Sequence, residues 1–247
     1  MVWELGVFII TLLYLGTLWV AYVHPESLLW PGAIFLLILF VATKIISKKF
    51  FHFILPTLLF FGTVLLLPLI DSPAQVKTFL ALSVGVFYLA ILGAYRLGKY
   101  EKDLTAKAMS NLAAFSALFA WFAAGYGWYL NYEFPAWIIM TVFAIVTFLV
   151  SYALVIINQL HLDRFQRILY SIFLAYLMAG VIWVQDFWPF GYLTTGVIAL
   201  IIYYSGWEVI RSHFLGKLNV RRIVFSIVFL VGAVAILLLS TKWYPVI

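Results

Sequence analysis

The chain has 247 residues, of which 66% are hydrophobic and only 10% are charged, and its net charge is +6. A soluble domain is about 45–50% apolar and about 25% charged, so this composition excludes a soluble enzyme, a nucleic-acid-binding module and a disordered tail. We therefore expect an integral membrane protein that binds no nucleic acid.

The hydrophobic residues form continuous runs of about 20 residues, which is the length that a helix needs to cross a bilayer. Continuous runs exclude a β-barrel, and a helix satisfies its own backbone in hydrocarbon. The sequence thus predicts an all-α polytopic membrane bundle of about nine helices, in a single transmembrane domain 1–247 with no soluble domain. The predicted helices are 3–23, 27–46, 51–70, 77–97, 107–129, 135–157, 168–187, 191–212 and 222–240.

Along the chain, Lys and Arg gather in the connections after the second, fourth, sixth and eighth predicted helices. These connections hold 13 of the 15 basic residues: Lys44, Lys48, Lys49, Arg96, Lys99, Lys102, Lys107, Arg164, Arg167, Arg211, Lys217, Arg221 and Arg222. Basic loops stay in the cytoplasm, so we expect a plasma-membrane protein with its N-terminus inside and its C-terminus outside. The N-terminal tail, with Glu4 and no basic residue, is outweighed by the later loops.

The predicted cytoplasmic face is strongly basic, whereas the outer face carries a small negative charge. Each basic residue near an anionic leaflet contributes about 1 kcal/mol of attraction. We therefore expect membrane lipids with anionic headgroups as partners at the cytoplasmic face.

The outer turns resemble one another. The first, third, fifth and seventh predicted helices each have a Gly followed three residues later by Trp or Leu, and the turn after each holds one acid and a Pro. Turn chemistry and the aromatic belt explain part of this pattern. Duplication of a two-helix hairpin, giving four repeated hairpins plus one helix, explains the shared spacing as well. Both interpretations stay open.

The acids of these outer turns are the first candidate binding site. If the hairpins surround one axis, Glu26, Asp71, Glu133 and Asp186 form an acidic ring, near which we place His24, Trp128, Trp183 and Trp188. Carboxylates among aromatic faces can hold a sugar headgroup, a cation or a positively charged peptide. The alternative is that these are ordinary turn residues beside an aromatic belt.

Glu208 is the deepest acid of the predicted spans, near the cytoplasmic end of the eighth helix. Arg211 follows three residues later on the same helix face, so an ion pair is predicted. We interpret this candidate inner ion pair as structural.

The middle third of each predicted helix contains no Asp, Glu, Lys, Arg or His, and the chain has no Cys. Ion-coupled transport and proton relays usually need such groups at depth, so their absence counts against a pump. No catalytic residue, metal site or cofactor is predicted.

Small residues on the fifth helix, namely Ser110, Ala113, Ala117, Ala120, Ala124 and Gly125, predict a buried stripe for close helix packing.

These features favour a non-enzymatic binding or scaffold subunit within the membrane, with a membrane-protein partner or a second copy of itself as possible partners. Two alternatives stay open. One is a carrier, channel or flippase for a neutral or lipid-linked substrate, suggested by the repeat and the acidic ring. The other is a lipid-modifying enzyme that uses two outer carboxylates as acid and base.

Overall fold

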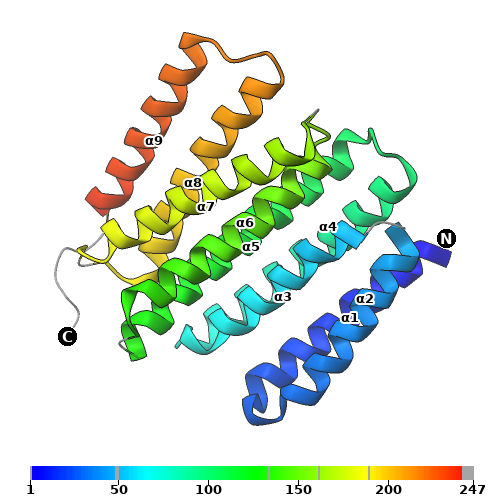
Figure 1. Ribbon diagram of the computed structural model, residues 1–247. Helices are drawn as coiled ribbons and strands as arrows, with labels where there is room; N and C mark the ends of the chain where they lie inside the picture. Colours follow the sequence, from blue (N-terminus) through cyan, green and yellow to red (C-terminus); the bar gives the residue numbers. More distant parts are fainter. Residues whose placement is uncertain (1, 48–49, 133, 161, 189, 241–247) are drawn as a thin grey trace. The chain divides into compact units, whose positions relative to one another are not determined.

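The computed structural model describes residues 2–47, 50–132, 134–160, 162–188 and 190–240 (Figure 1). These residues form helices joined by turns, and no strand occurs among them. Nine helical segments of this described part are long and apolar enough to cross a bilayer. The predicted all-α architecture of membrane-length helices is confirmed, and by length and composition it fits a multi-pass membrane protein.

The chain divides into two compact units, Met1–Ala117 and Leu118–Ile247. The predicted single domain and the predicted hairpin repeat both stay predictions. The first unit holds α1 (Val2–Val23), α2 (Leu29–Ser47), α3 (Ile54–Leu66), α4 (Pro73–Lys99) and the start of α5 (Leu104–Tyr132), with the short 3₁₀ helices η1 (Pro25–Ser27), η2 (Phe50–Phe53) and η3 (Leu67–Leu69). The second unit holds the rest of α5, then α6 (Ala136–Ile157), α7 (Arg164–Gln185), α8 (Tyr192–Phe214) and α9 (Val220–Ser240).

Several helices begin earlier than the hydrophobic pattern predicts, because capping groups lie ahead of the apolar run. Helix α4 begins with Pro73, whose missing N–H costs nothing in a first turn. Helix α7 begins after Asp163, which forms a capping box with Gln166. Helix α3 is shorter than predicted, because Pro68 cannot continue an α-helix and the chain tightens into η3.

Helices α1, α2, α3 and α4 of the first unit meet at an aromatic cluster. The Tyr14 ring stacks on Phe87 with centroids 4.0 Å apart, and Phe35 contacts Phe60 at 5.0 Å. The Tyr14 hydroxyl donates a hydrogen bond of 3.1 Å to Oγ1 of Thr63. Each helix thus contributes one ring to a buried core, and the polar tip of Tyr14 is satisfied inside it.

The connection between α4 and α5 is closed by an ion pair. Asp103 Oδ2 lies 2.7 Å from Nη2 of Arg96, while Asp103 Oδ1 accepts the backbone N–H groups of Thr105 and Ala106. The Ala106 N–H and the Arg96 guanidinium hold the pKa of the Asp103 carboxyl below its usual value. Asp103 therefore caps the N-terminus of α5 in its charged form.

Small residues allow close helix packing in both units. The predicted alanine stripe on α5 is buried at Ala113, Ala117, Ala120 and Ala124. In the second unit, a Cβ built on Gly196 of α8 would lie 2.9 Å from the backbone of Ala123 on α5. Lipid supplies no hydrophobic drive between helices, so such close approaches hold the unit together by van der Waals contact.

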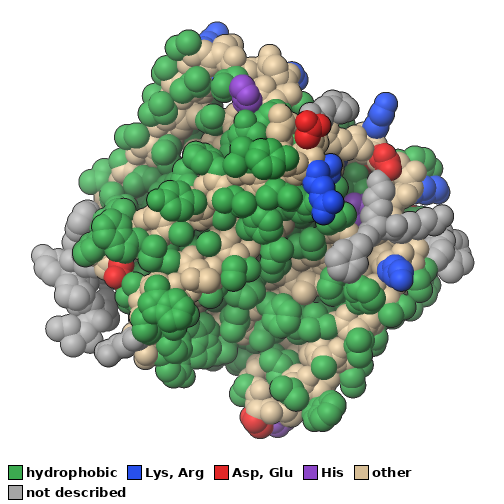
Figure 2. All heavy atoms as spheres, viewed as in Figure 1, with side chains coloured by type: hydrophobic (Ala, Val, Ile, Leu, Met, Phe, Trp, Pro, Cys, Tyr) green, Lys and Arg blue, Asp and Glu red, His purple; other side chains and the backbone are tan. Residues whose placement is uncertain are grey.

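The surface has the pattern expected for helices in lipid. Figure 2 shows hydrophobic side chains along the helices in view, whereas the Lys and Arg side chains in view lie near helix ends. Large apolar side chains such as Leu37, Tyr176 and Phe225 are exposed. Such exposure is expected where hydrocarbon takes the place of water.

We predict that Gly196→Ala lowers the thermal stability of the detergent-solubilised protein. The new methyl group would be forced against the Ala123 backbone, and overpacking of this kind costs about 1–3 kcal/mol. Gly180→Ala on α7 is the matched control, because nothing lies within 4 Å of a Cβ built there. Equal melting temperatures for the two variants would contradict the close contact of α5 and α8.

Candidate functional site

A tight turn joins α8 to α9 and determines which residues face each other. Gly216 has φ +64°, a left-handed conformation that suits glycine. Around it, the backbone N–H of Gly216 donates to the carbonyl of His213 and that of Lys217 to the carbonyl of Ser212. These two bonds form a Schellman motif, which ends α8 and reverses the chain.

The next helix begins three residues after this motif. The Asn219 side chain accepts the backbone N–H of Arg222 at 2.8 Å, which is the bond expected of an N-cap residue. The short turn and the cap together bring the first turn of α9 beside the last turns of α8. As a result Arg222 Nη1 donates to Ser212 Oγ at 3.4 Å and to the carbonyl of Lys217 at 3.4 Å.

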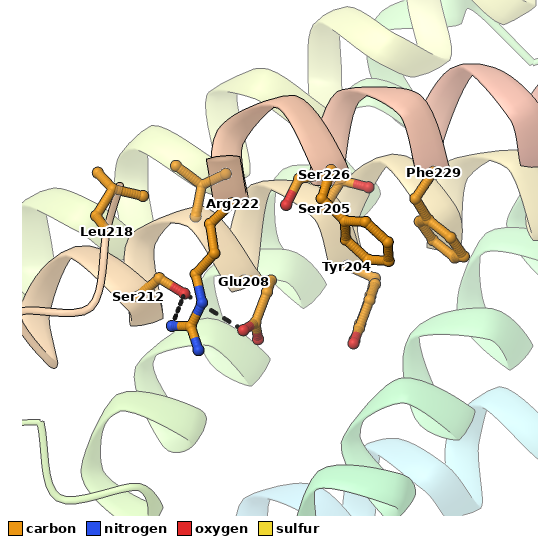
Figure 3. Close-up of a pocket in the computed structure, with 10 residues that line it drawn as sticks. Tyr204, Ser205, Glu208, Ser212, Leu218, Arg222, Ser226 and Phe229 are labelled. Carbon is orange, nitrogen blue, oxygen red and sulfur yellow. Dashed lines mark hydrogen bonds between the residues drawn. The ribbon is translucent and has the colours of Figure 1, made fainter. Parts of the chain in front are cut away.

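A cavity of about 380 Å³ lies between α8 and α9 (Figure 3). Its polar end is formed by Glu208, Ser212 and Arg222, which lie toward one another in Figure 3. Its apolar part is lined by residues of both helices and of the turn: Tyr204, Val209, Leu218, Phe225 and Phe229. Ser205 and Ser226 complete the lining. The cavity therefore changes from charged to aromatic along its length.

Ser205 lines the cavity with a hydroxyl that has no protein partner. Its side chain is only 8% exposed, and Oγ finds no hydrogen-bond partner among the described residues. A buried hydroxyl without a partner costs roughly 1–3 kcal/mol. An unsatisfied hydroxyl facing a cavity is the arrangement expected where a ligand supplies the missing bond.

The second wall of the cavity is helix α9, which packs along α8 on one side and is exposed elsewhere. Along its described length, 220–240, no residue is buried. Phe225 is 72% exposed and Phe229 44% exposed, although both line the cavity. The side of the cavity formed by α9 is therefore exposed at the surface of this unit.

The charges at the polar end are only partly compensated. Glu208 Oε2 lies 3.3 Å from Arg211 Nη1, and Glu208 Oε1 accepts a hydrogen bond from Ser212 Oγ at 3.3 Å. Among the ion pairs of the described residues, none involves Arg222. The carboxylate is therefore engaged within α8, and the Arg222 guanidinium faces the cavity with only neutral acceptors.

The outer acids of the predicted ring belong to both units. Glu26 lies in η1 and is exposed, and its Oε1 lies 3.6 Å from Nδ1 of the exposed His24. Asp71 is exposed in the turn before α4. Glu133 lies outside the described residues, and Asp186 belongs to the second unit. The structure brings His24 to Glu26, and the four-acid ring stays a prediction.

Asp186 contacts a tyrosine that the sequence argument did not single out. The Tyr129 hydroxyl of α5 forms a hydrogen bond with the Asp186 carboxylate at the end of α7. Next to it, Gln185 is buried and its carbonyl accepts the Tyr126 hydroxyl at 3.4 Å. The acid of this outer turn thus ties α7 to α5.

The predicted outer tryptophans pack against local aromatic side chains. Trp128 stacks on Tyr132 with centroids 5.2 Å apart. Trp183 meets Phe187 edge to face at 5.6 Å, and Trp188 meets Phe190 at 5.9 Å. Each of these contacts joins residues close in sequence, as expected of an aromatic belt.

The sequence predicts Glu208 beside Arg211, which the structure confirms, but it does not indicate that Ser205, Ser212 and Arg222 belong to the same site. The spacing of four α9 residues, at i, i+3, i+4 and i+7, does indicate that they share one face of the helix: Arg222, Phe225, Ser226 and Phe229.

Within the described ranges, no group of three His, Asp or Glu side chains could hold a metal ion. Comparisons with family models, curated proteins and solved structures found no match for this chain.

Proposed function

We propose that this protein is a non-enzymatic binding protein of the membrane, which holds an amphiphile in the cavity between α8 and α9. The observation that carries the proposal is the cavity itself, about 380 Å³ in volume, with a charged end and an aromatic end. Ligand pockets are typically about 300–1,000 Å³, mostly apolar, with a few polar groups that orient the ligand. A molecule with a polar head and an apolar chain matches both ends.

The exposure of α9 supports this role. A helix without buried residues adds little packing to the unit, since close van der Waals contact is what joins helices in lipid. Its cavity-facing residues instead present aromatic surface beside the unpartnered Ser205 hydroxyl. We infer that α9 forms one wall of a binding site open to the bilayer.

We also propose an orientation for the chain. Thirteen of the 15 Lys and Arg residues occur in alternate connections or near the helix ends beside them, and basic connections stay on the cytoplasmic side. The N-terminus is then cytoplasmic, and the turn between α8 and α9 faces the cytoplasm of a plasma membrane. On this topology the polar end of the cavity lies at the level of the inner headgroups.

Single-cysteine labelling tests the orientation cleanly, because the natural chain contains no Cys. We expect a membrane-impermeant maleimide added to intact cells to label Ser27→Cys, in an exposed outer turn. Lys102→Cys, in an exposed inner turn, is expected to react only after the cells are permeabilised. The cysteine-free parent controls for background, and the opposite labelling pattern would overturn the topology.

The variant Ser205→Leu tests the binding role. We expect the larger side chain to fill the cavity and to reduce co-purified lipid, counted by native mass spectrometry of protein released from its own membrane. Thr194→Leu, on α8 but outside the cavity lining, is the matched control. Equal lipid retention by the parent and both variants would contradict the proposed site, provided that all three have similar melting temperatures.

A further inference from the structure

We infer that the head of the bound amphiphile is a phosphate held by Arg222, so that the ligand is an anionic phospholipid. This inference rests on the proposed binding role of the α8–α9 cavity and names its ligand class. It makes Arg222 the residue that selects among lipids.

The local charge favours an anion. Residues 208–222 contain four basic side chains, Arg211, Lys217, Arg221 and Arg222, and one acid, Glu208. The Glu208 carboxylate forms an ion pair with Arg211, with Oε2 3.3 Å from Nη1, and its Oε1 accepts a hydrogen bond of 3.3 Å from the Ser212 hydroxyl. The polar end itself holds one acid and one base, and the three other basic side chains around it make this part of the chain positive overall, which attracts an anionic head.

The geometry of Arg222 suits an oxyanion such as a phosphate. Within the part of the chain that the structure describes, its Nη1 makes two long hydrogen bonds of 3.4 Å, to neutral oxygens of Ser212 and Lys217. A guanidinium presents five N–H donors in a planar fork that matches phosphate oxygens bidentately. The neutral oxygens of Ser212 and Lys217 bind the Arg222 donors only weakly. A phosphate in the cavity would therefore form stronger hydrogen bonds with these donors.

The apolar part of the cavity runs in line with this head site. Arg222, Phe225, Ser226 and Phe229 all line the cavity from α9, and their spacing places them on one face of the helix. At 1.5 Å of rise per residue, Arg222 and Phe229 are separated by roughly 10 Å along the axis. A lipid whose phosphate contacts Arg222 would lay the start of its acyl chain along Phe225 and Phe229.

Ser205 provides an observation that does not depend on charge, because its hydroxyl has no partner among the described residues and lines the cavity. Its buried hydroxyl lines the cavity deeper along α8 than Ser212. Ester and glycerol oxygens follow directly after the phosphate in a phospholipid, and a hydroxyl can donate to them. The charged head site and the Ser205 hydroxyl then bind successive parts of the same molecule.

The test compares phosphatidylglycerol with phosphatidylcholine of identical acyl chains, each titrated into the delipidated full-length protein in detergent. Native mass spectrometry counts the bound lipid. We expect the parent to prefer phosphatidylglycerol by about tenfold, and Arg222→Gln to lose most of that preference. Arg221→Gln removes the same charge from the neighbouring position outside the cavity lining, and we expect it to keep the preference.

The outcomes separate this inference from the proposed function. Equal binding of both lipids by the parent, with binding abolished by Ser205→Leu, would overturn the phosphate assignment and leave the binding site in place. Equal losses in Arg221→Gln and Arg222→Gln would also overturn it, because diffuse charge would then explain the preference. Binding of neither lipid would overturn both proposals.

A final experiment distinguishes a lipid phosphate from a free phosphate ion as the ligand. Inorganic phosphate is added at millimolar concentration to protein loaded with phosphatidylglycerol. We expect no displacement, because phosphate alone gains nothing from the aromatic wall. Full displacement would overturn the lipid assignment in favour of a soluble phosphate ligand.

Discussion

A peptide group inside a bilayer has no water to bond, so each segment that crosses hydrocarbon must satisfy its own N–H and C=O groups. This constraint makes every long apolar run of the chain a helix and confines irregular backbone to the short connections. Lipid is as apolar as the helix surfaces, so hydrophobicity does not decide which helices pack together. Their packing depends on how well their surfaces fit in shape. The close contact of Gly196 with Ala123 and the aromatic cluster around Tyr14 are two examples of such packing by shape.

The same constraint explains why α9 differs from its neighbours. Helices α5 and α8 approach closely through small residues, whereas α9 buries none of its described residues and meets α8 across a cavity. The Schellman turn and the Asn219 cap fix where α9 begins beside α8, and further along the two helices Tyr204 meets Phe229 edge to face at 6.2 Å. Between the turn and this ring contact lies the cavity that we propose to hold a molecule from the bilayer.

How much the sequence predicts depends on how local each feature is. The membrane-length helices follow from run length alone, and Glu208 lies near Arg211 because three residues separate them on one helix. The contact of Arg222 with Ser212 depends on a turn through Gly216, which hydropathy does not encode. Lipid-facing and protein-facing helix surfaces are both apolar, so the cavity and the Tyr129–Asp186 contact were not predicted.

A crystal structure of the full-length protein purified with its own lipids would test the central claim most directly. The proposed function predicts elongated density between α8 and α9, with its polar end at Arg222 and its apolar end along Phe229. A structure in which α9 closes onto α8, with the Ser205 hydroxyl bonded to protein and no room for a ligand, would contradict it.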